Sequence, residues 1–463
     1  MATWNKVLNL RYPITSLYQY FKSDGTGETL SVVNKYVNRV TDGKLTRLNG
    51  QLDFDKAKMI TYKSRTAKDI VLIADGGKLK RYDGTSIGEV LPHVPTDGTN
   101  GTPEETKEPG LNDLVNLTQF RTFALKKDRV YAAAHPTVKN RLSFSYFDPY
   151  LGFAVYDYFP ATYFIDIAVE DNDEIIELRV FRDTLIIFCK RSVWALHGDG
   201  ASIADLQLIK INVPKGCISP GSVQEVGNNL FYLADDHVYS LYSTDQSYIS
   251  AKMVSEPIEP ILESVALIEK EAAAATFYKG KYYLSFPSGL TLVYDSVIES
   301  WTKFTNIKAS SYLEKDGELL FSSSDGYIYR FNEKVFSDDG TPIPFSMKTK
   351  IIDFNAPVHR KKIKRIWVIQ RQFDKLESEF KLFGTFDQHS FIDLNVLNEN
   401  TGLGGVWDRS DWDDALWDFG EITQNEIKIR QKSKTLQLQI ENNKPDEPLT
   451  IYGVVIEYQI KKP

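Results

Sequence analysis

The stretch FRDTLIIFCKRSVWALHG (residues 181–198) is followed by GCISPGS and then by VGNNLFYLADDHVYSLY, which ends at residue 242. The same pattern occurs twice in these sixty residues. A polar turn leads into a short apolar run (185–188, then 230–233), and a second polar turn leads into an alternating run (193–196, then 238–241). Paired runs of this kind, rich in aromatic and aliphatic residues and joined by short polar turns, predict β-hairpins.

The composition predicts a soluble, largely β-structured protein of more than one domain. The chain has 463 residues, of which 42% are hydrophobic, 25% charged and 13% aromatic. This length predicts two or three domains, and the aromatic share favours strands over helices. The formal net charge of -7 argues against a nucleic-acid coat held by bulk positive charge.

The two cysteines and the first residues bear on where the protein is made. Cys189 lies in an apolar run and Cys217 in the following loop. Two cysteines in a chain of this length form no disulfide scaffold, which favours assembly in a reducing or redox-indifferent place. The N-terminal stretch lacks the apolar segment of a signal peptide, and no apolar run is long enough for a membrane helix. We expect synthesis in the cytoplasm, with later export as part of a particle left open.

Hairpin-containing units recur along the first three quarters of the chain. The central turns of six such units fall near residues 76, 137, 190, 235, 288 and 325, at spacings of 37 to 61 residues. Self-similar all-β units at about 40 to 50 residues are typical of propeller blades. The pattern predicts an all-β fold with a six-bladed β-propeller over residues 31–344, and a seventh, poorly marked blade remains an alternative.

Three segments of this region depart from the repeat. Residues 1–30 predict an extended arm. Residues 92–113, PHVPTDGTNGTPEETKEPGLND, predict an exposed loop, which is either a tolerated surface insertion or a contact with a neighbouring subunit. Residues 256–277, with Pro257 and Pro260 near their start, are either helical or a loop that crosses between strands.

Residues 345–463 predict a second all-β domain, a sandwich or one curved sheet. Eight Lys and Arg residues lie between positions 348 and 371 against the single Asp353. Alternation around Ile363, Ile366 and Val368 predicts that one face of this strand packs and the other is charged. The charged face is either solvated, a docking face for an acidic partner or neighbouring subunit, or a contact for passing nucleic acid. The candidate interface residues are Lys348, Arg360, Lys361, Lys362, Lys364 and Arg365.

Three tryptophans recur every five residues in WDRSDWDDALWDFG (residues 407–420). This spacing fits neither a helix nor a strand. Tryptophan in an irregular segment either fills a core or anchors an interface. Trp407, Trp412 and Trp417 are therefore further candidates for an interaction or inter-domain loop.

No motif for catalysis, metal or cofactor binding is present. The six histidines are not spaced as metal ligands, and neither a P-loop nor G-x-S-x-G occurs. The acidic clusters at 171–174 and 411–414 lack the spacing of a calcium loop and predict solvated turns. The Ser-x-Asp-x-Gly-x-x-Trp turns of sialidases are also missing. We expect a protein without enzymatic activity and without a cofactor.

Several of these segments together resemble the β-propeller tail proteins of bacteriophages. They are DNDEI (171–175), LRVFRDTLIIFCKRSVWALHGDG (178–200), GCISPGSVQEVGNNLFYLADDHVYSL (216–241) and the ending PLTIYGVVIEYQIKKP (448–463). The family comprises hub or nozzle proteins of short-tailed phages, including the packaged-DNA stabilisation group. Its members carry a Trp-Gly repeat before the last strand, and here Asp replaces most of those glycines.

The resemblance implies a structural virion protein in the phage tail, with no enzyme activity. Such proteins form a ring, usually of six copies, whose channel retains and later conducts the genome. The implied partners are further copies of the chain, an adjacent adaptor or connector ring, tail fibres or spikes, DNA that passes without sequence-specific binding, and the host envelope. The alternatives are a carbohydrate-binding or glycan-hydrolysing tail appendage, in which the three tryptophans would stack on sugars, and a cellular scaffold.

Overall fold

The structure is a computed structural model of the chain. It describes residues 12–63, 69–91, 119–148, 153–160, 162–198, 203–245, 248–332, 334–371, 379–389, 391–398 and 422–461. The protein is nearly all β, with 54% strand and 5% helix. It divides into two compact units, the first ending at Tyr329 and the second beginning at Arg330. The predicted fold class is confirmed.

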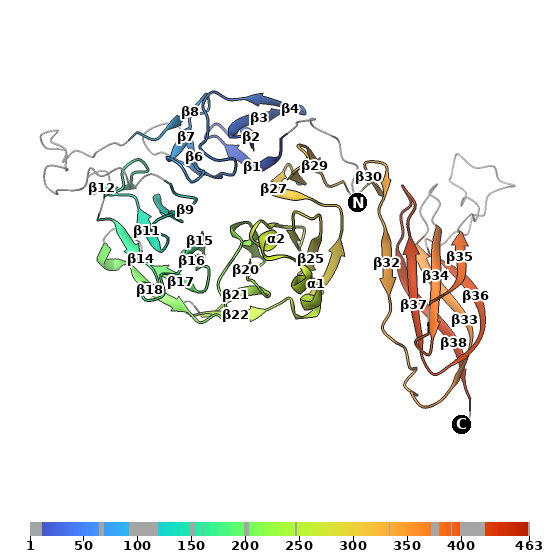
Figure 1. The fold of residues 1–463 in the computed structure, drawn as a ribbon. Coiled ribbons are helices and arrows are strands. Elements are labelled where there is room, and N and C mark those ends of the chain that lie inside the picture. The colour runs from blue at the N-terminus through green and yellow to red at the C-terminus, as the bar shows by residue number, and fades with distance from the viewer. Residues whose placement is uncertain are drawn as a thin grey trace, which may run out of the picture. The chain divides into compact units, whose positions relative to one another are not determined.

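The first unit consists of antiparallel sheets whose strands follow one another in the sequence. In the described residues there are six four-stranded sheets and one three-stranded sheet, which we call blades 1 to 7 (Figure 1). Blade 1 contains β1 (Ile14–Phe21), β2 (Gly27–Val33), β3 (Tyr36–Thr41) and β4 (Lys44–Arg47); blade 2 contains β5 (Lys58–Tyr62), β6 (Ile70–Ala74), β7 (Lys80–Tyr82) and β8 (Ile87–Glu89); blade 3 contains β9 (Thr122–Lys126), β10 (Arg129–Ala133), β11 (Arg141–Phe144) and β14 (Phe164–Asp166). Blade 4 contains β15 (Ile175–Phe181), β16 (Thr184–Cys189), β17 (Val193–His197) and β18 (Gln207–Ile211); blade 5 contains β19 (Gln224–Val226), β20 (Asn229–Leu233), β21 (Val238–Asp245) and β22 (Tyr248–Met253). Blade 6 contains β23 (Ala274–Tyr278), β24 (Lys281–Ser285), β25 (Thr291–Asp295) and β26 (Ser300–Phe304); blade 7 contains β27 (Ala309–Lys315), β28 (Glu318–Ser323) and β29 (Ile328–Arg330).

Smaller elements lie between the blade strands. A two-stranded hairpin, β12 (Phe147–Asp148) and β13 (Phe153–Ala154), is inserted in blade 3, and 3-10 turns occur at Ile203–Asp205 and Pro220–Ser222. The helical alternative for residues 256–277 is confirmed in part. A 3-10 turn (Glu256–Ile258), α1 (Glu259–Ser264) and α2 (Leu267–Glu271) lead directly into β23.

The hairpins predicted in residues 181–242 are present. β15 and β16 pair with Phe181 opposite Thr184, so Arg182 and Asp183 form a two-residue turn, and both have positive φ. Such a turn matches the right-handed twist of the paired strands. Apolar side chains lie on both faces of β16, because blade 3 covers one side of blade 4 and blade 5 covers the other.

The blades close into a ring because blade 1 packs against blade 7. Ile14, Leu17 and Val33 of blade 1 share a buried cluster with Ile328 of blade 7. Separate buried clusters join blade 1 to 2, 2 to 3, 3 to 4, 4 to 5 and 5 to 6. A blade alone cannot bury both of its faces, so radial packing of this kind supplies the core.

The propeller has seven blades, which was the alternative to the predicted six. The blade without a predicted counterpart is blade 1, and it corrects the expectation of an arm over residues 1–30. From Ile14 onwards these residues form β1 and β2. The pairing of β1 with β2 is irregular between Ile14 and Ser16, as it is in the first strands of blades 4 and 7.

The second unit is a β-sandwich that begins at Arg330, earlier than the predicted boundary at residue 345. Within this unit, a short hairpin of β30 (Ser337–Asp338) and β31 (Thr341–Pro342) precedes the strands of the sandwich. One sheet has the order β32-β37-β34-β35 and the other β36-β33-β38. Their strands are β32 (Phe345–Lys348), β33 (Lys361–Arg371), β34 (Glu379–Phe386), β35 (Ile392–Asn398), β36 (Ile422–Ser433), β37 (Leu436–Asn442) and β38 (Ile451–Ile460).

The core of the sandwich contains the three residues expected from the alternation of the basic strand. Ile363, Ile366 and Val368 are buried together with side chains of β34, β36 and β37. Both sheets contribute to this single cluster, as in a sandwich packed face to face. The sandwich is thereby confirmed.

Candidate functional site

A cavity of about 580 Å³ lies at the centre of the propeller. Its lining residues come from all seven blades, mostly from the first strand of each or from the loop before that strand. Leu17 of β1, Lys58 of β5, Glu177 of β15 and Tyr312 of β27 are examples. Cavities of this volume are in the range of small-molecule sites.

An ion pair between the partly exposed Lys58 and the buried Glu177 holds one wall of this cavity together. The Lys58 ammonium donates to the Glu177 carboxylate, to Oγ1 of Thr122 at 2.9 Å and to the carbonyl of Leu178 at 3.2 Å. Thr122 in turn donates to Glu177 at 3.1 Å. Burial lowers the pKa of Lys58, although Glu177 opposes this shift. The three side chains belong to blades 2, 3 and 4, so the network ties three blades together at the centre.

Three further cations line the same cavity. They are Lys56 and Arg121, both exposed, and Arg179, which is half-buried. Arg179 donates through Nη2 to the carbonyl of Val223 at 2.8 Å, and its Nε is buried without a hydrogen-bond partner in the described part of the chain. The surrounding walls lower the pKa of Lys56, and Glu177 opposes that shift.

The second carboxylate of the lining, Asp75, is committed to the backbone. Its oxygens accept hydrogen bonds from the N–H groups of Asp53, Phe54 and Gly77, and Lys80 lies 3.7 Å away. Asp75 therefore fixes a loop, and its negative charge still offsets part of the positive charge of the lining. The lining thus has four cationic side chains, Lys56, Lys58, Arg121 and Arg179, against two carboxylates, Glu177 and Asp75.

The remaining wall of the cavity is uncharged. It presents hydroxyl and amide side chains beside small and apolar ones. These are Ser310, Ser311, Tyr312, Tyr18 and Gln224, with Pro220, Gly221, Ala274 and Ala275 between them. The cavity is accordingly cationic on the side of blades 2 to 4 and polar but uncharged on the opposite side.

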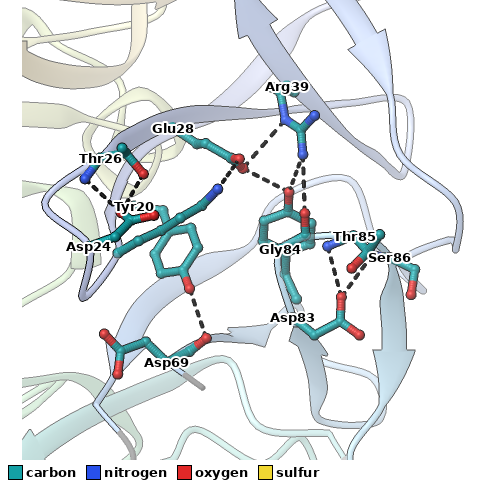
Figure 2. Close-up of polar contacts among 12 residues, drawn as sticks. Tyr20, Asp24, Thr26, Glu28, Arg39, Asp69, Asp83, Gly84, Thr85 and Ser86 are labelled. Atoms are coloured by element: carbon teal, nitrogen blue, oxygen red, sulfur yellow. Dashed lines mark hydrogen bonds and ion pairs between the residues drawn. The ribbon is translucent and has the colours of Figure 1, made fainter.

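A second polar network lies between blades 1 and 2 (Figure 2). Tyr82 donates to Glu28 at 2.8 Å, Arg39 donates to Tyr82 at 2.7 Å, and Arg39 lies 3.4 Å from Glu28. Lys22 also pairs with Glu28. Burial raises the pKa of Tyr82 to about 12. These groups bond to one another across the two blades, although Nε of Arg39 has no hydrogen-bond partner among the described residues. We interpret the network as packing between blades.

The predicted basic strand is β33, and one of its lysines is buried. Lys361 has 0% exposure. Its ammonium donates to the carbonyls of Ala356 at 2.5 Å and Lys434 at 2.7 Å. Burial lowers its pKa, with Asp353 and Asp387 opposing. Lys361 is therefore an internal support of the sandwich, which corrects its prediction as an interface residue.

Lys362, Lys364 and Arg365 do lie toward solvent. The pairing of β33 is irregular between Ile363 and Arg365, and this bulge places two consecutive cations near one carboxylate. Lys364 lies 3.2 Å and Arg365 3.6 Å from Glu457 of β38, and Arg365 lies 3.4 Å from Glu426 of β36. The neighbouring strands therefore offset part of the predicted charge.

Lys348 and Arg360 are exposed but lie apart from that group. Lys348 ends β32, in the other sheet, and its ammonium lies 5.1 Å from the centre of the Phe391 ring. Arg360 directly precedes β33, and its carbonyl accepts a hydrogen bond from Lys461. Trp407, Trp412 and Trp417, like residues 92–113, lie outside the described residues.

The outer face of the sheet β36-β33-β38 contains residues that the basic run alone does not reveal. Lys362 is opposite Lys432 and Arg365 is opposite Lys428, while Trp367 is opposite Val455. We define the outer face as Lys362, Lys364, Arg365, Trp367, Glu426, Lys428, Lys432, Val455 and Glu457. It combines five cations, two carboxylates and two apolar side chains, of which Val455 is 48% exposed.

The central cavity was not predicted from the sequence. Its residues are separated by up to about 300 positions and form no motif, because they come from short stretches of all seven blades. The available signal is weak: a charged residue within an otherwise apolar strand, such as Lys58 in KMITY or Glu177 in IIELRVF.

Metal-binding and membrane-spanning features are not found in the described part of the chain. No group of three or more His, Cys, Asp or Glu side chains is arranged there to hold a metal ion. No helix in it is long and apolar enough to cross a membrane. Cys189 and Cys217 are free and buried.

Comparison with known proteins finds likeness at the level of solved structures. No family model and no curated protein matches the chain. The chain is similar to the computationally designed Ika8 protein (12% identity, 70% of this chain and 98% of that one, TM-score 0.40). It is also similar to BBS1N, solved in complex with ARL6DN (10% identity, 72% and 98%, TM-score 0.44), and to BamB from Moraxella catarrhalis (10% identity, 69% and 83%, TM-score 0.39).

Proposed function

We propose that the chain is a structural subunit of a bacteriophage tail, built into a ring whose copies dock on one another through the outer face of the sandwich. Neighbouring tail proteins dock on this ring. The observation that carries the docking role is the composition of that face. Trp367 and Val455 lie side by side among Lys362, Arg365, Lys428 and Lys432. Tryptophan and arginine are the residues most enriched where proteins bind one another.

The charge of the outer face favours an acidic partner. Five cations face two carboxylates there, an excess of three positive charges, on a chain whose formal net charge is -7. A positive patch on a negative protein is complementary to the acidic remainder of another copy, and such complementarity guides association and register. Copies of the chain are therefore the partners that this face fits first.

The assignment to a phage tail is supported by the family resemblance of residues 171–241 and of the C-terminal strand. In such a ring the protein would act mechanically: rigid propellers would surround a channel, and net negative charge would keep DNA from adhering to its wall. The virion would then be its place of action, and neither enzymatic activity nor a cofactor would be needed.

Two observations test the tail assignment. Genes for a portal and an adaptor should lie beside the gene of this chain. Mass spectrometry of phage particles purified from the phage that encodes it should detect the chain in several copies per particle. Intact infectious particles without the chain would refute the tail assignment, while the docking role of the outer face would still be testable with the purified protein.

A further inference from the structure

Among the described residues, the lining of the central cavity has more cationic side chains than carboxylates. Lys58 is paired with Glu177, and Asp75 is occupied by three backbone N–H groups and by Lys80. Lys56, Arg121 and Arg179 remain, and all three line the same cavity. Charges of one sign within low-dielectric walls attract counter-ions more strongly than the same charges on an open surface.

One group in this cavity is incompletely satisfied. Nε of Arg179 is buried and has no hydrogen-bond partner in the described part of the chain, whereas Nη2 is bound to Val223. The Nε atom has under 1 Å² of accessible surface, so the protein itself encloses it and a ligand would meet the guanidinium through its other nitrogens. Arginine also offers parallel N–H groups that match the oxygens of a phosphate.

The uncharged wall of the cavity is suited to a ligand that carries polar or apolar groups besides its anionic group. Ser310, Ser311 and Gln224 offer hydrogen-bonding groups, and Ala274 and Ala275 offer apolar contact. A volume of about 580 Å³ admits a small molecule and excludes a folded macromolecule.

We propose that the central cavity of the propeller binds a small phosphate-bearing anion, with Lys56, Arg121 and Arg179 as the residues that hold its charge. The ligand class is inorganic di- or triphosphate or a phosphate ester of similar size. Two or more negative charges match the excess of two cations over carboxylates in the lining. This site is independent of the docking role of the sandwich.

Isothermal titration calorimetry of the full chain with inorganic pyrophosphate, at physiological ionic strength, tests the proposal. We expect one site per chain. Lys56→Gln should weaken binding about tenfold or more, the loss expected for one charge-assisted contact. Lys44→Gln is the matched control, because Lys44 is an exposed strand lysine that does not line the cavity. Lys56 is itself exposed, so its replacement should leave folding intact.

Two further arms complete the test. Arg179→Gln should abolish binding, and its thermal midpoint is measured beside it, since the variant also loses the contact with Val223. Ribose 5-phosphate in place of pyrophosphate distinguishes an ester from a free phosphate: tighter binding of the ester would assign a role to the uncharged wall. Absence of pyrophosphate and ester binding to the wild-type chain, or binding unchanged by Lys56→Gln, would overturn the proposal.

Discussion

The central cavity of the propeller and the outer face of the sandwich both gather lysine and arginine, but they treat the charge differently. In the cavity, Glu177 is 4% exposed and pairs with Lys58 among the inner strands of the blades. On the outer face, the side chain of Glu457 is 38% exposed and lies near Lys364 and Arg365 at 3.2 and 3.6 Å. The same kind of pair is enclosed in one region and solvated in the other.

This difference in enclosure determines what each region can bind. Two unit charges 4 Å apart interact by about 1 kcal/mol in water and about 4 kcal/mol at an effective dielectric constant of 20. Exposed charges are also screened beyond about 8 Å at physiological salt. The cavity gathers Lys56, Arg121 and Arg179 around one small space, although Lys56 and Arg121 are exposed. A small anion can meet several of these cations at once, whereas the outer face needs many weak contacts over a wide surface, as a protein partner provides.

The largest effect is expected from removing one carboxylate in each region. Glu177→Ala would leave the partly buried Lys58 without its carboxylate, although Thr122 and the carbonyl of Leu178 still accept from it. The variant should destabilise the propeller by about 1 to 3 kcal/mol. Glu457→Ala should cost less than about 1 kcal/mol, because exposed ion pairs contribute little. Urea titration with hydrogen exchange of peptides from each unit measures both. Equal losses of unfolding free energy in the two variants would show that burial does not change how much the ion pair contributes in each region.

A buried and an exposed lysine on one strand sharpen the comparison. Lys361→Met would leave the carbonyls of Ala356 and Lys434 without their donor and should cost about 1 to 3 kcal/mol. Lys362→Met, at the neighbouring half-exposed position, should change stability by no more than about 0.5 kcal/mol. Thermal unfolding of the two variants, with hydrogen exchange of sandwich peptides, provides the measurement. A stable Lys361→Met variant would contradict the supporting role of Lys361.

The smallest effect concerns pH and the network between blades 1 and 2. Burial by itself would raise the pKa of the Glu28 carboxyl. The hydrogen bonds from Lys22 and Tyr82 and the charge of Arg39 outweigh burial, so the pKa lies below its ordinary value of 4.5. Its stabilising contribution is therefore fully present above pH 4.5 and is lost as the pH falls through the lowered pKa.

Glu28→Gln should accordingly lower the thermal midpoint at neutral pH and flatten its decline in acid. The control is Glu89→Gln, because the pair of Glu89 with Lys78 is exposed at both side chains and should contribute little. If the thermal midpoint of the wild-type protein falls with pH in the same way as that of Glu28→Gln, Glu28 does not provide the stabilisation attributed to this network.

The strands and hairpins were predictable because their signals are local. Alternation located β33 and its buried Ile363, Ile366 and Val368, and the polar pair Arg182 and Asp183 marked a turn. The propeller followed from repetition of such signals along the chain. Blade 1 was not counted, although its first strand pairs no more irregularly than the first strands of blades 4 and 7.

The candidate sites were less predictable because they depend on contacts between distant residues. The basic run identified Lys362, Lys364 and Arg365 correctly as solvent-facing, but it gave no sign that Lys361 is buried or that Glu426 and Glu457 offset the charge. The central cavity had no sequence signature, since residues from seven blades meet only when the ring closes.

Sedimentation velocity of the purified chain over a range of concentrations tests the docking role of the outer face most directly. The wild-type protein should form an assembly of several copies. The double variant Lys428→Glu and Lys432→Glu should raise the protein concentration needed for assembly at least tenfold. Lys303→Glu, an exposed position on β26 of the propeller, should not. A wild-type chain that stays monomeric at every concentration, also when tail particles are added, would contradict the proposed function.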